Sequence, residues 1–182
     1  EDSWNREHVW PKSRGFPSEE TYAHNDIHHL VPADKSVNSD RSGKDFEEGG
    51  EEHPECCNCK WDGKNGAEGQ FEPPSAVKGQ IARIMFYMEV RYDGNDRDKA
   101  NGPNLQIVDE RTRTGEVGKI GKLSDMKKWH CEHKVTQEER DRNNIIQSWQ
   151  GNRNPFIDRP ELVERAWNFS CDEFPSNRND EL

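Results

Sequence analysis

Residues 5–41 read NREHVWPKSRGFPSEETYAHNDIHHLVPADKSVNSDR, and this stretch decides the fold that the sequence predicts. Two short segments, residues 7–10 and 28–31, carry β-branched or aromatic residues that favour strands. Each segment precedes a proline, Pro11 or Pro32, which we expect to close the strand. Cap-forming Ser and Asp residues follow Asn38, so a short helix should begin near that residue. The predicted order is strand, loop, strand and short helix.

The middle of the chain alternates between a loop and a helix. Residues 47–70 show no hydrophobic period and include three cysteines, so we expect a loop there. After two prolines, apolar residues recur at helical spacing over residues 77–92 and predict the core helix. The opposite stripe of that helix is polar; it could contact phosphate, but such a stripe more often faces solvent, and we favour exposure to solvent for Arg91. This stripe consists of Gln80, Arg83, Tyr87 and Arg91.

The C-terminal half is predicted to be mainly helical. Residues 93–121 read as a surface excursion that contains one strand, residues 105–108. Thr136 and Glu139 form a capping box that opens a helix, and a glycine supplies its C-terminal stop. A final helix starts near Pro160, where apolar residues again share one face.

Composition limits the classes of protein to which the chain can belong. Its 182 residues suit one domain, and we expect a single domain over residues 1–182. Only 29% of the residues are hydrophobic and 34% are charged, with a net charge of −10. That charge opposes nucleic-acid binding by broad phosphate neutralisation, so any such function needs a local set of cations. The sequence has no apolar run long enough to span a membrane, and we expect no membrane partner.

Five cysteines are many for a cytosolic enzyme of this size and indicate an oxidising compartment. Two interpretations remain open: a zinc site that combines thiols with His130 and His133, or disulfides. Disulfides are favoured because of the compartment, and the odd number leaves one thiol unpaired. We expect the two histidines to lie on the surface. The cysteines are Cys56, Cys57, Cys59, Cys131 and Cys171.

The dipeptide Glu7-His8 couples a hard oxygen ligand with a group that titrates near neutral pH. Adjacent strand residues point to opposite faces, so both can serve one site only if the strand twists or ends there. Taken alone, such a pair is usually a solvated surface feature. Residues 26–32 and 37–41 supply further histidine, carboxylate and amide groups that could complete a site.

Several segments together resemble the bacterial endonuclease I family, a group of ββα-metal nucleases related to the His-Asn-His enzymes. The resemblance implies an α+β fold: a mixed helical domain with a small β-sheet and a central ββα-metal (His-Me finger) motif at about residues 5–46. A cysteine-containing loop over about 47–70 and a helical part over about 75–170 would follow. The matching segments are REHVWP (6–11), DIHHLVP (26–32), VNSDR (37–41), EPP (72–74), IAR (81–83), FYM (86–88) and QGNRNPF (150–156).

The resemblance also implies roles for individual residues. His8 would be the general base, and Glu7 with Asn38 would hold Mg²⁺ directly. The chemistry agrees, because a neutral imidazole can take a proton from water near pH 7. Mg²⁺ needs only one or two protein oxygens and neutralises charge on the phosphate in the transition state. Mn²⁺ or Ca²⁺ could replace Mg²⁺ in binding.

An arginine would hold the scissile phosphate, since a planar guanidinium can grip two phosphate oxygens. Arg14 and Arg41 are the candidates. Arg83 is a third option for contacting substrate, although it could instead brace the fold. His29 would orient His8 across the loop rather than bind metal, and Asp26 is placed with it as a positioning residue.

The predicted function is therefore a secreted or periplasmic, sequence-nonspecific endonuclease that hydrolyses phosphodiester bonds of DNA, and potentially RNA, to 5′-phosphate products. We expect a monomer with no obligate protein partner. The alternative is a non-catalytic extracellular binding module stabilised by disulfides or zinc. A third reading is an incomplete enzyme, because family members commonly carry a helical segment before the stretch that begins at Asn5.

Overall fold

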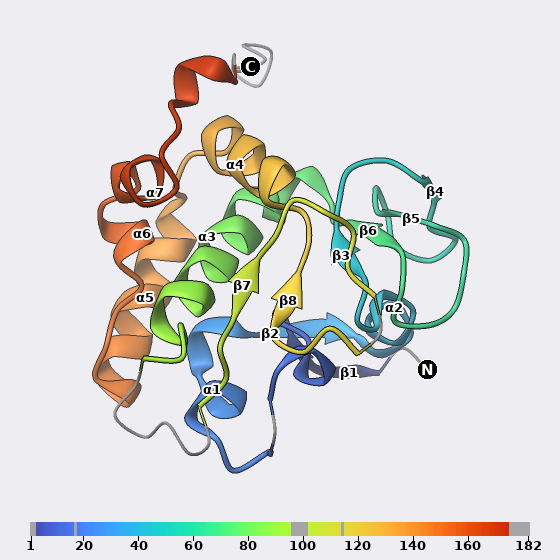
Figure 1. The fold of residues 1–182 in the computed structure, drawn as a ribbon, viewed down its shortest axis with the longest axis horizontal. Coiled ribbons are helices and arrows are strands. Elements are labelled where there is room, and N and C mark those ends of the chain that lie inside the picture. Colours follow the sequence, from blue (N-terminus) through green and yellow to red (C-terminus); the bar gives the residue numbers. More distant parts are fainter. Residues whose placement is uncertain (1–2, 17, 96–101, 114, 175–182) are drawn as a thin grey trace.

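The N-terminal part of the chain folds as a strand–strand–helix unit, described here from a computed structural model that covers residues 3–16, 18–95, 102–113 and 115–174. Strands β1 (Trp4–His8) and β2 (Leu30–Asp34) pair antiparallel, with His8 opposite Leu30. Helix α2 (Lys35–Arg41) follows and packs against both strands (Figure 1). The connection between the strands contains η1 (Lys12–Arg14), α1 (Tyr22–Asn25) and η2 (Ile27–His29).

Several predicted boundaries in this unit are wrong. Strand β1 covers Trp4–His8 rather than residues 7–10, so it ends before Pro11 is reached. Strand β2 does not stop at Pro32 but continues through it, and Pro32 lies opposite Arg6. Each strand of a two-stranded sheet is an edge, where a missing N–H donor is tolerated. Helix α2 begins at Lys35 rather than near Asn38, because the Asp34 carboxylate caps it by accepting the Ser36 and Val37 N–H groups.

A second, four-stranded sheet includes two short strands within the region predicted to be a loop and two strands at its ends. Its order is β3-β6-β5-β4, so residues 47–70 are only in part a loop. Short polar strands without a hydrophobic alternation gave no signal in the sequence. A disulfide joins Cys56 to Cys59 beside this sheet, and Cys57 is free. The strands are β3 (Asp45–Phe46), β4 (Glu51–Glu52), β5 (Lys60–Trp61) and β6 (Gln70–Glu72).

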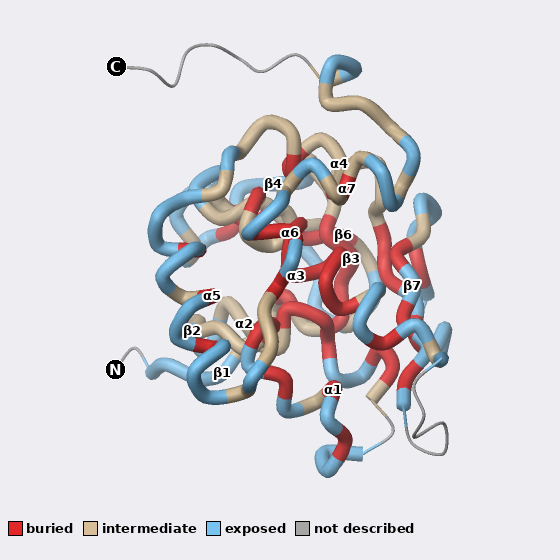
Figure 2. The backbone as a smooth tube through the Cα atoms, turned by 90° about the vertical axis from the view of Figure 1, so that its left-hand side faces the viewer, coloured by how far each residue is buried: buried red, intermediate tan, exposed pale blue. Residues whose placement is uncertain are grey.

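Helix α3 (Ser75–Arg91) lies at the centre of the fold, as predicted, but both of its faces are covered. Every residue from 82 to 88 is buried, so the expected solvated stripe is wrong for Arg83 and Tyr87. Arg91 is exposed, as expected. Figure 2 shows the buried stretches gathered along α3 and its neighbours, with the outer turns exposed. Burying Arg83 is possible because it is fully paired, as described below.

Helix α4 (Leu123–Glu132) was not predicted, although Leu123, Met126 and Trp129 recur at helical spacing and the last two are fully buried. A disulfide from Cys131 to Cys171 ties this helix to the C-terminal turn η3 (Cys171–Glu173). The disulfide interpretation is thus confirmed. The same helix buries His130, which we had expected on the surface.

The predicted strand of the surface excursion is present as β7 (Gln106–Ile107), which pairs parallel with β8 (Lys119–Ile120). The excursion itself lies partly outside the described residues, at 96–101 and 114. None of the described helices is long and apolar enough to cross a membrane.

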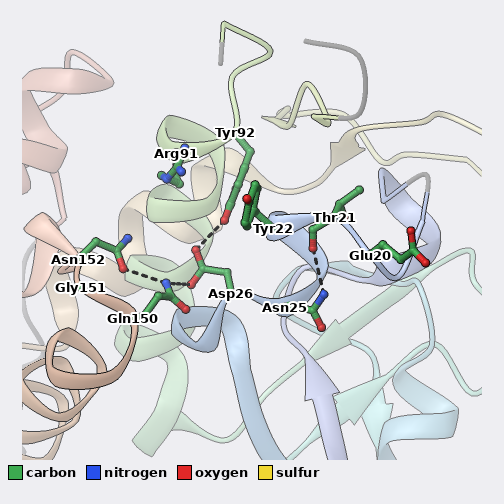
Figure 3. A pocket seen from close by; sticks show the side chains of 10 residues that line it. All are labelled: Glu20, Thr21, Tyr22, Asn25, Asp26, Arg91, Tyr92, Gln150, Gly151 and Asn152. Atoms are coloured by element: carbon green, nitrogen blue, oxygen red, sulfur yellow. Dashed lines mark hydrogen bonds between the residues drawn. The ribbon is translucent and has the colours of Figure 1, made fainter. Parts of the chain in front are cut away.

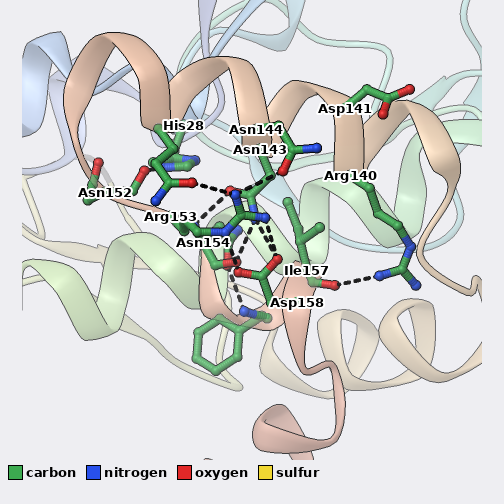
Figure 4. Close-up of polar contacts among 12 residues, drawn as sticks. His28, Arg140, Asp141, Asn143, Asn144, Asn152, Arg153, Asn154, Ile157 and Asp158 are labelled. Carbon is green, nitrogen blue, oxygen red and sulfur yellow. Dashed lines mark hydrogen bonds and ion pairs between the residues drawn. The ribbon is translucent and has the colours of Figure 1, made fainter.

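The C-terminal helices confirm the capping predictions and close the α+β fold. Helix α5 (Gln137–Gln150) opens with the Thr136–Glu139 capping box and stops at Gly151, whose φ of 86° suits glycine. Asn154 then caps α6 (Pro155–Asp158) and exchanges hydrogen bonds with Asn143 of α5 (Figure 4). The short helix α7 (Glu161–Ala166) follows Pro160.

Candidate active site

His8 is the last residue of strand β1, and its ring is surrounded by three other aromatic rings. The ring centroids of His24 and His29 lie 4.5 Å and 5.2 Å from that of His8, and Phe16 lies 6.4 Å away. The Nε2 atom of His8 is 3.0 Å from the backbone carbonyl oxygen of His24. A carbonyl can only accept a hydrogen bond, so Nε2 must carry the proton. In the neutral ring, Nδ1 is then left with its lone pair.

The surroundings keep this imidazole neutral. Burial, reinforced by the neighbouring His24, lowers the pKa of His8 to about 4. At neutral pH the ring is therefore in its neutral form, with the proton on Nε2 and the lone pair on Nδ1. His24 was missed by sequence reasoning because its contribution is a backbone carbonyl, which no side-chain pattern reveals. The one usable signal is Thr21, whose hydroxyl caps α1 and so shapes this turn.

Glu7 and Asn5 project from the same side of β1, toward α2, because alternate strand residues share a face. A Glu7 carboxylate oxygen lies 3.0 Å from Nη1 of Arg41, and the amide nitrogen of Asn38 donates to the Asn5 side-chain oxygen at 2.7 Å. Glu7 and His8 thus diverge, as alternation predicts. Glu7 contacts α2 through Arg41, whereas the His8 ring contacts α1 and η2 at the end of the strand.

These residues fit a hard divalent cation. The Asn38 amide is oriented by its donated bond, and its side-chain oxygen has no bonding partner among the described residues. The Glu7 carboxylate is largely buried with one ion-pair partner, and this burial raises its pKa despite the opposing charge of Arg41. A cation would relieve that cost. The described residues contain no cluster of three or more acidic, histidine or cysteine side chains. The donors at this position are one carboxylate and one amide oxygen, which are the ligands that hard cations prefer.

Arg41 is buried and braces the end of the strand. Its Nη1 and Nη2 atoms donate to the backbone carbonyls of His8 and Val9, at 3.3 Å and 2.7 Å. Its guanidinium also lies 4.3 Å from the centroid of the Phe46 ring. Of the three arginines suggested by the sequence, it is the one that contacts another candidate site residue.

The other two arginines are held elsewhere. Arg14 is 2% exposed, and its donors are used by the backbone oxygens of Gly43, Ala67 and Arg113 and by the Thr112 hydroxyl. Arg83 is 1% exposed and makes two hydrogen bonds to Glu139, at 2.7 Å and 2.8 Å. The structure therefore places both within the protein interior and does not bring either to Glu7 and His8.

His29 and Asp26 belong to the segment between α1 and β2 that packs against His8. The His29 carbonyl accepts the Val9 N–H at 3.0 Å, and burial lowers the pKa of the fully buried His29 ring to about 3. Burial by itself would raise the pKa of Asp26, but the donors that surround the carboxylate outweigh it and hold the pKa below its ordinary value. The donors are Gln150, Tyr87, Tyr92 and the His28 N–H. Asp26 thus fastens η2 to α3 and α5.

Comparisons with known proteins identify the family of the chain. A sequence model described as Endonuclease I matches residues 1–161. The chain is 44% identical over 165 residues to the extracellular ribonuclease of Bacillus amyloliquefaciens, covering 90% of this chain and 54% of that protein. It is 30% identical over 151 residues to an extracellular deoxyribonuclease of Aeromonas hydrophila, covering 81% and 56%. The chain spans about half the length of these curated relatives. It belongs to the Endonuclease I family.

Proposed function

We propose that this chain is a Mg²⁺-dependent, sequence-nonspecific endonuclease in which His8 is the general base and Glu7 and Asn38 hold the metal. The observation that carries the proposal is the bond from Nε2 of His8 to the His24 carbonyl. It fixes the tautomer whose Nδ1 can accept a proton. The Asn38 oxygen, which has no partner among the described residues, and the largely buried Glu7 carboxylate would supply the hard ligands on the adjoining face.

The residues divide the work of phosphodiester hydrolysis. His8 takes a proton from the attacking water, and the His24 carbonyl stabilises the imidazolium that results. Arg41 positions His8 through the backbone carbonyls at the end of β1 and holds Glu7 in place. When bound, the metal neutralises charge on the phosphate and on the leaving 3′ oxygen, which leaves the phosphate on the 5′ side.

The substrate class that we propose is nucleic acid of either kind. The relatives include proteins named ribonucleases and proteins named deoxyribonucleases, so the proposal covers both RNA and DNA. The reacting group is the phosphodiester, which carries no sequence information. Because the relatives are named extracellular or periplasmic and the fold contains disulfides, we also propose export from the cytoplasm.

The test is cleavage of supercoiled plasmid and of a structured RNA by the purified chain, with Mg²⁺ or with EDTA, alongside His8→Ala. We expect no cleavage with EDTA or with His8→Ala. The products of the wild type should be substrates for a ligase that requires a 5′ phosphate. Circular dichroism and the melting temperature establish that His8→Ala is folded. A folded wild type that cuts neither substrate, or a His8→Ala variant that cuts normally, would contradict the proposal and favour a binding module.

A further inference from the structure

A cavity of about 570 Å³ lies between α1, the end of α3 and the residues that follow α5 (Figure 3). Its volume is within the range of about 300–1,000 Å³ that is typical of small-molecule sites. Tyr22 and Asn25 line it from α1, and Arg91 and Tyr92 line it from the end of α3. A second cavity of about 520 Å³ shares Arg91 and Asn152 with it.

This cavity adjoins the candidate active site through α1. The same short helix carries His24, whose carbonyl holds His8, and Tyr22 with Asn25, which line the cavity. Helix α1 has four residues, so it is about 6 Å long. An occupant of the cavity would therefore contact the same short helix that holds His8.

The charges of the cavity favour a neutral, planar occupant over a phosphate. Two carboxylates, Glu20 and Asp26, line it against one guanidinium, that of Arg91. Phosphate groups are repelled by such a surplus of negative charge, whereas a nucleic-acid base is uncharged. The guanidinium of the exposed Arg91 lies 4.9 Å from the centroid of the buried Tyr92 ring, and a planar guanidinium is a group on which a base can stack.

Tyr22 is the most accessible stacking surface. It is 79% exposed, which is unusual for an aromatic residue beside a cavity. The floor below is rigid, because Asp26 accepts hydrogen bonds from the Tyr92 hydroxyl and from Gln150 (Figure 3). Because Asp26 and its partners are already held in place, ordering a ligand against them costs less entropy.

We propose that this cavity, defined by Tyr22, Asn25, Asp26, Arg91 and Tyr92, accepts an unpaired base of a single-stranded nucleic acid, which stacks on Tyr22. The proposal rests on the proposed function in that it names the form of substrate that the neighbouring site receives. A base held in a duplex is stacked between its neighbours and cannot enter without unpairing. The site consequently favours single strands over duplexes.

The test separates binding from cleavage. Fluorescence anisotropy measures the binding of a short labelled single-stranded DNA and of its duplex in EDTA, where the proposed cleavage cannot occur. We expect Tyr22→Ala to weaken binding of the single strand about 5- to 150-fold, the range for one stacked base, and to leave duplex binding unchanged. Tyr22→Phe retains the ring and should bind like wild type. Trp149→Ala, which removes an aromatic residue that is 82% exposed but does not line the cavity, is the matched control.

A strand with abasic sites gives a second measurement. The affinity of the abasic strand for the wild type should be as low as the affinity of the intact strand for Tyr22→Ala. The affinity of Tyr22→Ala for the abasic strand should be no lower than its affinity for the intact strand. Equal binding of intact strand by wild type and Tyr22→Ala, or an equal loss in Trp149→Ala, would overturn the inference. If binding depends on Tyr22 but the wild type never cuts, the inference is supported and the proposed function is contradicted. If the wild type cuts normally but binding does not depend on Tyr22, the proposed function is supported and the inference is overturned.

Discussion

Two buried arginine–glutamate pairs, one in each half of the molecule, differ in how completely they are bonded. Between α3 and α5, Arg83 makes two hydrogen bonds to Glu139, and a Glu139 oxygen also accepts the Thr136 N–H. Between β1 and α2, Arg41 contacts Glu7 through a single Nη1 atom at 3.0 Å, and its buried Nε has no partner among the described atoms.

The difference separates a structural pair from a candidate functional one. A saturated buried pair, in which every side-chain nitrogen and oxygen atom has a partner, offers little to a ligand and holds its two helices together. An incompletely bonded pair costs stability and is retained where something else completes it. The Glu7 carboxylate belongs to such an incomplete pair, and the side-chain oxygen of Asn38 on α2 also has no partner among the described residues. We therefore expect substitutions in the Arg83–Glu139 pair to change stability, and substitutions around Glu7 to change activity.

The largest expected effect is at the saturated pair. Arg83→Met should lower the free energy of unfolding by about 3–5 kcal/mol, because it leaves the Glu139 carboxylate buried without its cation. Urea denaturation measures this loss, and cleavage per folded molecule should stay unchanged. In a double-mutant cycle, Arg83→Met with Glu139→Gln should lose less than the sum of the single variants. Additive losses would show that the pair is not coupled, and a loss of activity in folded Arg83→Met would break the comparison.

The second prediction concerns Asn38, near the incompletely bonded Arg41–Glu7 pair. Asn38→Leu removes the candidate ligand oxygen and should lower cleavage about 100-fold or more, equivalent to about 2.7 kcal/mol in the barrier. Stability should change by less than about 1 kcal/mol, since the half-buried side chain loses one hydrogen bond, to Asn5. Asn38→Asp keeps an oxygen at this position and should retain more activity than Asn38→Leu. Equal activity in the two variants would argue against a ligand role.

The third prediction concerns the buried carboxylate of Asp26, which, among the described residues, accepts hydrogen bonds from neutral donors only. Asp26→Asn should cost about 1–3 kcal/mol of stability at pH 7, because an amide presents donors to groups that are themselves donors. The folded pKa of Asp26 is lowered, so its contribution is present above the unfolded pKa of about 3.9 and is lost as the pH falls below that value. The difference between wild type and variant should thus shrink in acid. A difference that is constant with pH would contradict this assignment.

The smallest effect is expected at the cap that supports the saturated pair. Thr136→Ala removes the hydroxyl that accepts the Glu139 N–H and should cost about 1 kcal/mol, measured by urea denaturation. Thr136→Ser keeps the hydroxyl and serves as the control. If Thr136→Ser lost as much as Thr136→Ala, the methyl contact rather than the cap would be responsible.

Local signals in the sequence predicted the features that depend on neighbouring residues. The periodicity of α3 and the capping box of α5 need no distant partner, and both predictions are confirmed. The four-stranded sheet was largely missed because its strands have two or three residues each, too few for a pattern. Helix α4 had a pattern, with Met126 and Trp129 three residues apart, that could have been used.

The candidate site was predictable as a set of residues but not as an arrangement. The sequence suggested Glu7, His8 and Asn38 together, and the fold places β1 against α2. It could not show that Arg14 is bonded to residues as distant as Ala67 and Thr112, because spacing along the chain does not reveal long-range partners. Nor could it show that a backbone carbonyl, that of His24, fixes the tautomer of His8.

The most direct test of the central claim is metal binding itself. Isothermal titration of the wild-type chain with Mn²⁺, a spectroscopically useful substitute for Mg²⁺, should give one site. Glu7→Gln and Asn38→Leu should each weaken that site strongly, whereas His8→Ala, which removes the base and not a ligand, should leave it intact. Equal Mn²⁺ affinity in wild type, Glu7→Gln and Asn38→Leu would contradict the assignment of these incomplete groups as the metal ligands.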